Sequence, residues 1–327
     1  MRFGPVPLAE AEGAILAHSE RVAEGRLRKG VTLERAHLDA LAAAGLREVT
    51  VARLEAGDVH EDAAARRLAL ALREGAEGLE ATRARMGRVN LLAERAGLVV
   101  IDRAAVDAAN AVDPVITVAT VAPFHGLRAG GMAATVKIIA YAVPETALAR
   151  AEAAARGAMR FATPRYGTAT LIVTDSVGGP GLKGVDAIAQ RLDGFDMTLT
   201  ETRRTAHEID ALAEAIAAAE GDVVLILTGS ATSDIRDTAP EALRRAGGEV
   251  TRFGIPVDPG NLSFTGRLGT RPVVGLPGSA RSPVLHGADW VLGRVICDVG
   301  LSDSEMAAMG VGGLLKEMPS RPSPRRG

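Results

Sequence analysis

Three short loops rich in Gly, Ser, Thr and Asp carry the residues best suited to chemistry in this 327-residue chain. They follow the apolar runs that end at Thr174, Thr228 and Leu276. Such loops offer backbone amides, hydroxyls and carboxylates rather than bulky side chains. Because ligands of an open parallel sheet sit at the carboxyl ends of its strands, we expect the three loops to form one polar site.

The loop that begins at Thr228 predicts a binding place for an anion. The next helix begins with Thr238-Ala239-Pro240-Glu241, which matches a capping box with proline in the first turn. The positive end of that helix would face the loop and favour a phosphate. An ordinary strand-to-helix turn would have the same pattern, so both interpretations stand at this point. The expected binding residues of this loop are Thr228, Gly229, Ser230, Thr232, Ser233 and Asp234.

Three aspartates could supply the acidic groups of such a site. Asp237 precedes the helix and could hold a metal or a polar ligand group, or it could cap the helix or pair with Arg236 or Arg244. Asp175 directly follows a buried strand. Asp186 starts the next helix, so it is either a cap or a second carboxylate for Mg²⁺.

The Gly-rich segment 176–184 contains Lys183, one of only four lysines in the chain. A lysine among glycines suits a phosphate oxygen, although a solvated lysine is the alternative. The spacing matches neither a P-loop nor a dinucleotide fingerprint. Two Pro-Gly turns further along could present amides to a ligand or only reverse the chain. From these segments the expected binding residues are Ser176, Lys183, Pro259, Gly260, Asn261, Pro277, Gly278 and Ser279.

Strands and helices alternate after residue 164, which predicts an α/β domain with a mostly parallel sheet, preceded by smaller α+β units. In the smaller units, the patterns predict an Ala-rich helix over 61–83 and a second helix over RVNLLAERAG. The expected divisions are 1–75, 76–163 and 164–312, followed by a disordered tail over 313–327.

Composition excludes several classes of function. The net charge of −2 argues against nucleic acid as the main partner, and an aromatic content of 3% argues against base-stacking platforms. A single cysteine, Cys297, excludes a disulfide framework and a thiolate zinc cluster, and we expect it to be buried and inert. The six histidines lack the spacings of transition-metal sites.

Localisation is predicted from two absences in the sequence. No apolar run has the length of a membrane span, and the N-terminal segment MRFGPVPLAEAEG lacks the form of a signal peptide. We therefore expect a soluble cytoplasmic protein with no membrane partner.

The loops taken together resemble a known family. TGSATSDIRDTAPEALRRAG is similar to the TGG…RDxTPEA signature of the molybdopterin-binding domains of molybdenum cofactor biosynthesis. VDPGN and VVGLPGSARSP resemble the PGKP and GLPGNP turns of the molybdopterin molybdotransferase (gephyrin-type) branch. The resemblance covers about residues 165–300.

This resemblance implies a three-layer α/β/α fold, a homodimer or homotrimer, and a ligand that has a pterin, a dithiolene and a terminal phosphate. It also implies that acidic residues bind Mg²⁺ or act near molybdate. By position, Asp237 and Asp175 are the expected catalytic residues, and Asp237 and Asp186 are the expected metal ligands. Molybdopterin is then the expected ligand or substrate.

The chain departs from the family pattern at three places. Ser230 replaces the second Gly of TGG, Ser279-Ala280 replaces the Asn-Pro of the last turn, and the SxMDGYA segment that serves molybdate insertion is missing. Binding of molybdopterin, free or nucleotide-activated, is therefore the leading hypothesis, with molybdotransferase activity as its enzymatic form. The alternatives are a Mg²⁺-dependent nucleotide hydrolase or transferase, and a non-catalytic carrier or scaffold for a cytidylyltransferase or an apo-molybdoenzyme.

Overall fold

The computed structural model describes residues 1–176 and 179–315, and the chain forms two compact units. Unit 1 contains Met1–Glu94, Val99–Pro123 and Ala129–Phe161. Unit 2 contains Arg95–Leu98, Phe124–Arg128 and the chain from Ala162 onward. The division expected near residue 75 falls within unit 1 and stays a prediction. The expected disordered tail lies almost entirely outside the described residues, as do two residues of the Gly-rich segment, 177 and 178.

The first part of unit 1 is a small α+β layer. Its helix α1 begins after Glu34, whose side chain accepts from the backbone of His37 while the His37 ring accepts from the backbone of Glu34. The elements are β1 (Arg2–Pro7), η1 (Leu8–Glu10), β2 (Ile15–Leu16), β3 (Glu20–Val22), β4 (Gly25–Leu27), α1 (Arg35–Ala43) and β5 (Glu48–Arg53).

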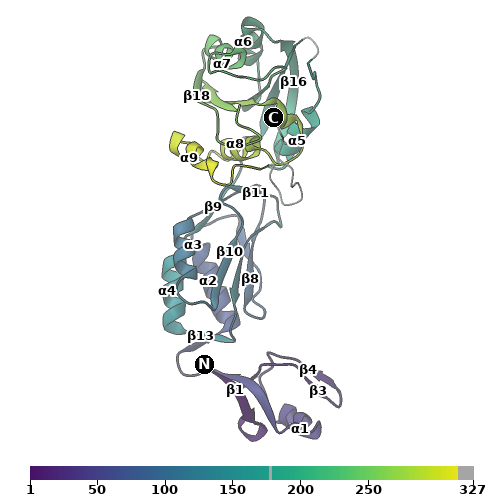
Figure 1. The fold of residues 1–327 in the computed structure, drawn as a ribbon, viewed down its shortest axis with the longest axis vertical. Helices are drawn as coiled ribbons and strands as arrows, with labels where there is room; N and C mark the ends of the chain where they lie inside the picture. The colour runs from purple at the N-terminus through teal and green to yellow at the C-terminus, as the bar shows by residue number, and fades with distance from the viewer. Residues whose placement is uncertain (177–178, 316–327) are drawn as a thin grey trace. The chain divides into compact units, whose positions relative to one another are not determined.

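The rest of unit 1 is built around an antiparallel sheet of order β10-β12-β8-β7. Figure 1 shows the helices α2, α3 and α4 beside this sheet. The strands are β6 (Asp58–His60), β7 (Leu79–Ala81), β8 (Arg88–Ala93), β9 (Gly97–Ile101), β10 (Ile116–Thr120), β12 (Met132–Ile138), β13 (Ala142–Pro144) and β14 (Met159–Ala162). The helices are α2 (Glu61–Leu72), α3 (Arg103–Asn110) and α4 (Glu145–Ala155).

Two helix predictions for this region are wrong. The segment predicted as a helix over RVNLLAERAG contains strand β8, in which Val89, Leu91 and Ala93 are buried. This alternation has the period of a strand with one buried face, not that of a helix. The Ala-rich helix ends at Leu72 rather than near residue 83, because the glycines that follow adopt positive φ and β7 begins at Leu79.

Unit 2 has a six-stranded sheet of order β16-β15-β17-β20-β19-β18. The first four strands run parallel, and the last two pair antiparallel. The sheet is therefore mixed, and the predicted parallel arrangement describes only part of it. The six strands are β15 (Thr168–Asp175), β16 (Thr198–Ala206), β17 (Val223–Leu227), β18 (Glu249–Phe253), β19 (Phe264–Leu268) and β20 (Arg271–Leu276). The short strand β11 (His125–Leu127) is not part of this sheet.

Alternate residues of the central strands pack against different helices. Leu171 belongs to a cluster with residues of α5 and α8, whereas Ile172 belongs to a cluster with residues of α6 and α7. Figure 1 shows α6 and α7 side by side in unit 2. Each fully buried Leu, Ile or Val contributes about 1.5–3 kcal/mol to the packing of these layers. The helical elements are α5 (Val185–Asp193), α6 (Ile209–Ala217), α7 (Thr238–Arg245), η2 (Gly278–Arg281), α8 (Gly287–Ile296), α9 (Asp303–Ala307) and η3 (Ala308–Gly310).

Cys297 follows α8 and is buried, as predicted. Burial raises the pKa of its thiol to about 12, so the thiol stays protonated and unreactive at neutral pH. Across residues 1–176 and 179–315, no helix combines the length and apolarity needed to cross a membrane.

We expect the substitution Gly275→Ala to destabilise unit 2. A Cβ at Gly275 would lie 1.9 Å from the ring of Phe264, its register partner on β19. Overpacking of this kind costs about 1–3 kcal/mol of unfolding free energy. Trp290, the single tryptophan, belongs to unit 2 and reports its unfolding by fluorescence in urea.

Gly300→Ala is the matched control for this prediction. A Cβ at Gly300 would meet nothing within 4 Å, so the unfolding midpoint should not move. An equal loss of stability in both variants would show that the contact with Phe264 is not the cause.

Candidate functional site

The ends of three neighbouring parallel strands are joined by hydrogen bonds. The amide of Gly229 donates to Thr174 Oγ1 at 2.9 Å, and Ser176 Oγ donates to the carbonyl of Gly229 at 3.1 Å. Thr174 Oγ1 also lies 2.8 Å from His207 Nδ1, at the end of β16. A Cβ at Gly229 would lie 2.6 Å from the carbonyl oxygen of Thr174. Glycine is therefore required here for the two loops to approach each other.

A cavity of about 760 Å³ opens beside these strand ends. Its walls come from the loop before α5, the loop after β17, the segment around residue 261 and the loop after β20. The predicted binding residues that line it are Lys183, Thr228, Gly229, Ser230, Asn261, Pro277, Gly278 and Ser279. The structure thus brings together residues from each of the loops singled out in the sequence.

Thr228 carries an unpartnered hydroxyl at this cavity. The residue is only 3% exposed, and its Oγ1 has no hydrogen-bond partner among the described residues. A buried hydroxyl without a partner costs about 1–3 kcal/mol. Such exceptions are rare in native proteins and call for an explanation such as an absent ligand or water.

Backbone amides add further donors. The amides of Ser230, Ala231, Gly278 and Ser279 donate to no other residue in the described part of the chain. All four residues line the cavity. Fixed amides of this kind suit an anion or a polar heterocycle, because they need no reorganisation when the ligand arrives.

Arg281 holds the loops of the cavity together and was missed in the sequence. Its Nη1 donates to the carbonyls of Gly181 and Lys183 at 2.9 and 2.6 Å, and its Nη2 donates to the carbonyl of Thr228 at 3.1 Å. Burial lowers the pKa of its guanidinium, and the charge of Asp175 opposes that shift. The arginine that follows Pro277-Gly278-Ser279-Ala280 was the signal that could have indicated it.

His286 orients the hydroxyl of Ser279. Its Nδ1 accepts from the amide of Ala288 at 3.0 Å, so in the neutral ring the proton lies on Nε2. Nε2 lies 2.7 Å from Ser279 Oγ and donates to it. The hydroxyl hydrogen of Ser279 is then available to a ligand. The sequence gives no motif that marks this role of His286, since its six histidines lack the spacings of metal sites.

Arg191 fixes the same loop from the side of α5. Its Nη1 donates to the carbonyl of Ala280 at 2.9 Å, and its Nη2 donates to the carbonyls of Ser282 and Val284 at 2.7 and 3.0 Å. Its Nε pairs with Asp289. The wall after β20 is thereby held in one conformation.

The remaining residues of the loop after β17 lie outside the cavity lining. Asp237 is the N-cap of α7, and its two oxygens accept from the amides of Thr238 and Ser233 at 2.7 and 2.9 Å. Asp234 pairs with Arg236, whose amide is the main cause that lowers the pKa of the Asp234 carboxyl. Thr232 is buried away from the lining.

The other two predicted carboxylates, Asp175 and Asp186, have different surroundings. Asp175 accepts two hydrogen bonds from the guanidinium of Arg204, at 3.0 and 2.6 Å. Asp186 is exposed in the first turn of α5. Within the described residues, no group of three or more His, Cys, Asp or Glu side chains could hold a metal ion. The Mg²⁺ role of Asp186 and Asp237 stays a prediction.

Pro259 and Gly260 support the start of α8 instead of lining the cavity. The carbonyl of Pro259 accepts from the amide of Gly287 at 2.8 Å. Gly260 has a φ of +136°, and a Cβ there would lie 2.8 Å from the backbone of Gly287. Only glycine fits this turn. The next residue, Asn261, lines the cavity.

The chain is similar to one family model and to a solved structure. Residues 5–53 match a family described as a domain of unknown function (DUF8806). No curated protein matches the chain. The solved molybdopterin biosynthesis MoeA protein from Pyrococcus horikosii is similar at 15% identity with a TM-score of 0.33, over 91% of this chain and 75% of that chain. A likeness this distant does not establish a shared function.

We expect Arg281→Met to lower the unfolding free energy of unit 2 by about 1–3 kcal/mol, because hydrogen bonds from a charged donor to three carbonyls are lost. Trp290 fluorescence in urea measures the change. Arg236→Met is the control, since Arg236 is exposed and its pairing with Asp234 should contribute little. Equal effects of the two substitutions would contradict the bridging role of Arg281.

Proposed function

We propose that unit 2 binds molybdopterin or a nucleotide-activated form of it, in the biosynthesis or delivery of the molybdenum cofactor. The observation that carries this proposal is the buried hydroxyl of Thr228, which has no partner within residues 1–176 and 179–315 and lies in a cavity lined by the loops of the TGG-like and GLPG-like motifs. The motifs indicate the ligand class, and the cavity supplies the donors that such a ligand needs.

The chemistry of the cavity fits a polar, phosphorylated heterocycle. Its volume lies within the range of about 300–1,000 Å³ that small-molecule sites occupy. The described lining contains Lys183 and Arg281 but no Asp, Glu or aromatic residue. A ligand would therefore be held by hydrogen bonds and positive charge rather than by stacking.

Binding is better supported than catalysis. Asp237 and Asp175 are the expected catalytic residues, but the first already accepts two backbone amides and the second is paired with Arg204. Molybdotransferase activity with Mg²⁺ is thus the secondary form of the proposal. A cytidylyltransferase or an apo-molybdoenzyme as partner, and a homodimer or homotrimer, belong to the proposal as well.

Thr228→Val should weaken ligand binding without lowering the stability of the free protein. Valine has the same shape but lacks the unpartnered hydroxyl, so the unfolding free energy of the free protein should stay equal or rise by about 1 kcal/mol. Molybdopterin binding should weaken by about tenfold, the loss of one hydrogen bond to the ligand. Urea unfolding and a binding titration measure the two effects.

Thr170→Val is the control for that pair of measurements. Thr170 is fully buried, and its Oγ1 accepts from the amide of Gly221 at 3.0 Å and donates to Glu201 at 3.3 Å. This substitution should lower stability and leave binding unchanged. A destabilising effect of Thr228→Val with unchanged binding would show that the Thr228 hydroxyl has only a structural role.

The ligand itself is tested by oxidising freshly purified protein to a fluorescent pterin derivative, with molybdenum and phosphate quantified alongside. No pterin in the protein and no binding of added molybdopterin would overturn the proposal.

Asp237→Asn separates the enzymatic form of the proposal from the carrier form. Turnover that is lost while binding persists indicates an enzyme. Bound pterin with no turnover in either protein indicates a carrier, and turnover of nucleotides with Mg²⁺ would favour a hydrolase or transferase.

A further inference from the structure

The hairpin between β7 and β8 in unit 1 ends in a tight turn. Met86 and Gly87 both adopt left-handed backbone angles, with φ of 51° and 68°. Arg85 and Arg88 flank the turn and exchange backbone hydrogen bonds of 3.1 Å. Two consecutive residues of positive φ give the turn type whose twist matches a hairpin.

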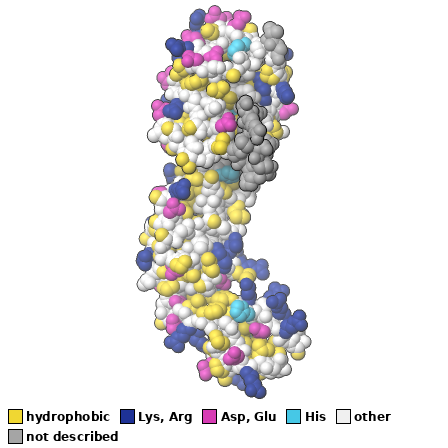
Figure 2. Space-filling view, viewed as in Figure 1, with side chains coloured by type: hydrophobic (Ala, Val, Ile, Leu, Met, Phe, Trp, Pro, Cys, Tyr) yellow, Lys and Arg dark blue, Asp and Glu magenta, His cyan; other side chains and the backbone are white. Residues whose placement is uncertain are grey.

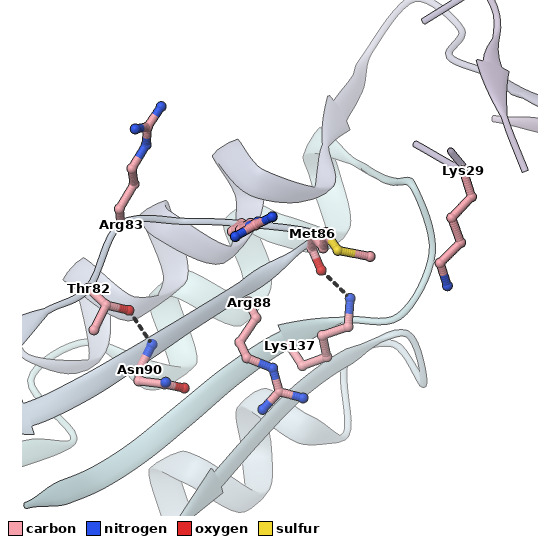
Figure 3. A pocket seen from close by; sticks show the side chains of 8 residues that line it. Lys29, Thr82, Arg83, Met86, Arg88, Asn90 and Lys137 are labelled. Atoms are coloured by element: carbon pink, nitrogen blue, oxygen red, sulfur yellow. Dashed lines mark hydrogen bonds between the residues drawn. The ribbon is translucent and has the colours of Figure 1, made fainter. Parts of the chain in front are cut away.

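The turn is held in place by the elements around it. The amide of Gly87 donates to Asp62 Oδ1 at 2.6 Å, and its carbonyl accepts from the amide of Ile138 at 2.8 Å. Lys137 Nζ donates to the carbonyl of Met86 at 2.5 Å, as Figure 3 shows. A Cβ at Gly87 would lie 2.5 Å from Glu61 Oε2, so only glycine fits. The turn is therefore fixed before any ligand arrives.

Three cations stand in a row across this structure. Arg85 lies directly opposite Arg88 in a β-bridge, and Arg88 lies directly opposite Lys137 in the register of β8 with β12. Like charges directly opposite each other destabilise a sheet. Lys137 pairs with Glu61 at 3.5 Å, but neither arginine forms an ion pair with any other described residue. The row thus has an excess of positive charge in the free protein.

A cavity of about 490 Å³ lies at this row. Figure 2 shows Lys and Arg side chains gathered on the viewed face of unit 1 near β8. Thr82, Met86 and Asn90 complete the lining, and the described lining contains no carboxylate and no aromatic ring. The five cations that line the cavity are Lys29, Arg83, Arg85, Arg88 and Lys137.

We propose that this cavity, which we call the hairpin cavity, binds a compact anion with two adjacent phosphate groups, either pyrophosphate or the diphosphate part of a nucleotide. One guanidinium can donate two parallel hydrogen bonds to the oxygens of a phosphate. A diphosphate also carries enough negative charge to relieve the repulsion along the row of cations. A single-stranded nucleic acid is disfavoured because the lining offers no ring for base stacking. The hairpin cavity is separate from the proposed function of unit 2.

Isothermal titration of the full chain at low ionic strength, without Mg²⁺, tests this assignment. Pyrophosphate and ADP should bind saturably and about equally, because no lining residue grips the base. Orthophosphate should bind at least about tenfold more weakly, since it contacts fewer of the cations. If ADP binds at least tenfold tighter than pyrophosphate, the base is recognised and the diphosphate assignment is wrong.

Charge variants locate the binding. Arg85→Gln and Arg88→Gln should each weaken pyrophosphate binding by about tenfold, the loss of a charge-assisted contact. Arg66→Gln is the matched control: Arg66 is an exposed arginine on α2 that does not line the cavity, and binding should be unchanged. An equal loss in all three variants would show only a general effect of charge and would overturn the assignment.

A stability measurement separates binding from misfolding. In the absence of anion, Arg85→Gln should melt at the same temperature as the unmodified chain or higher, because it removes the repulsion with Arg88. Melting below the unmodified chain, or an oligonucleotide that binds more tightly with increasing length, would count against the proposal. Weakening of pyrophosphate binding by Thr228→Val would assign the anion to unit 2 instead.

Discussion

The contacts of one guanidinium hold the candidate site of unit 2 together. Arg281 joins the loop before α5 to the loop after β17 through backbone carbonyls, while its own backbone belongs to the loop after β20. Gly184 makes this possible, because a Cβ there would lie 2.5 Å from the Cβ of Arg281. The arginine thus links three segments of the chain. Without these hydrogen bonds, nothing would fix the walls of the cavity relative to one another. Its charge also gives that cavity a positive character.

The buried strands of unit 2 were predictable because their sequences are almost purely apolar and β-branched. TATLIVT and DVVLILT form β15 and β17, and their loops meet at one end of the sheet as expected. β8 was not predictable in the same way, since RVNLLAERAG is compatible with a helix until its partner strands are known. Strand β19 was also missed, because its five residues, FTGRL, have a glycine at the centre and large apolar residues only at the two ends, Phe264 and Leu268.

Within the site, the sequence predicted which loops line the cavity better than it predicted the role of each residue. The motif at Thr228 and the turn at Pro277 do line the cavity. Asp237 had two interpretations in the sequence, and the hydrogen bonds to Ser233 and Thr238 support the helix cap. Arg281 donates to carbonyls of Gly181, Lys183 and Thr228, which lie far from it in the sequence. His286 acts on Ser279, which lies seven residues away, and no spacing of a known motif marks that contact.

The two cavities offer anions different kinds of attraction. The cavity of unit 2 presents amides and hydroxyls whose positions are fixed by the sheet, and such short-range donors lose little strength in salt. The hairpin cavity relies on the net charge of exposed arginines, which salt screens over a distance of about 8 Å at physiological ionic strength. The first is suited to selecting a ligand by shape, and the second to selecting one by charge density.

The cavity of unit 2 is assembled from Lys183, Thr228, Asn261 and Ser279, which lie far apart in the chain. Most of its walls follow parallel strands of the sheet, and Asn261 lies just before β19 in the antiparallel part. Ligand binding is therefore linked to the folding of the whole unit rather than to the order of one loop. A bound ligand would protect amides throughout the sheet from hydrogen exchange, and local opening of any contributing strand would release it.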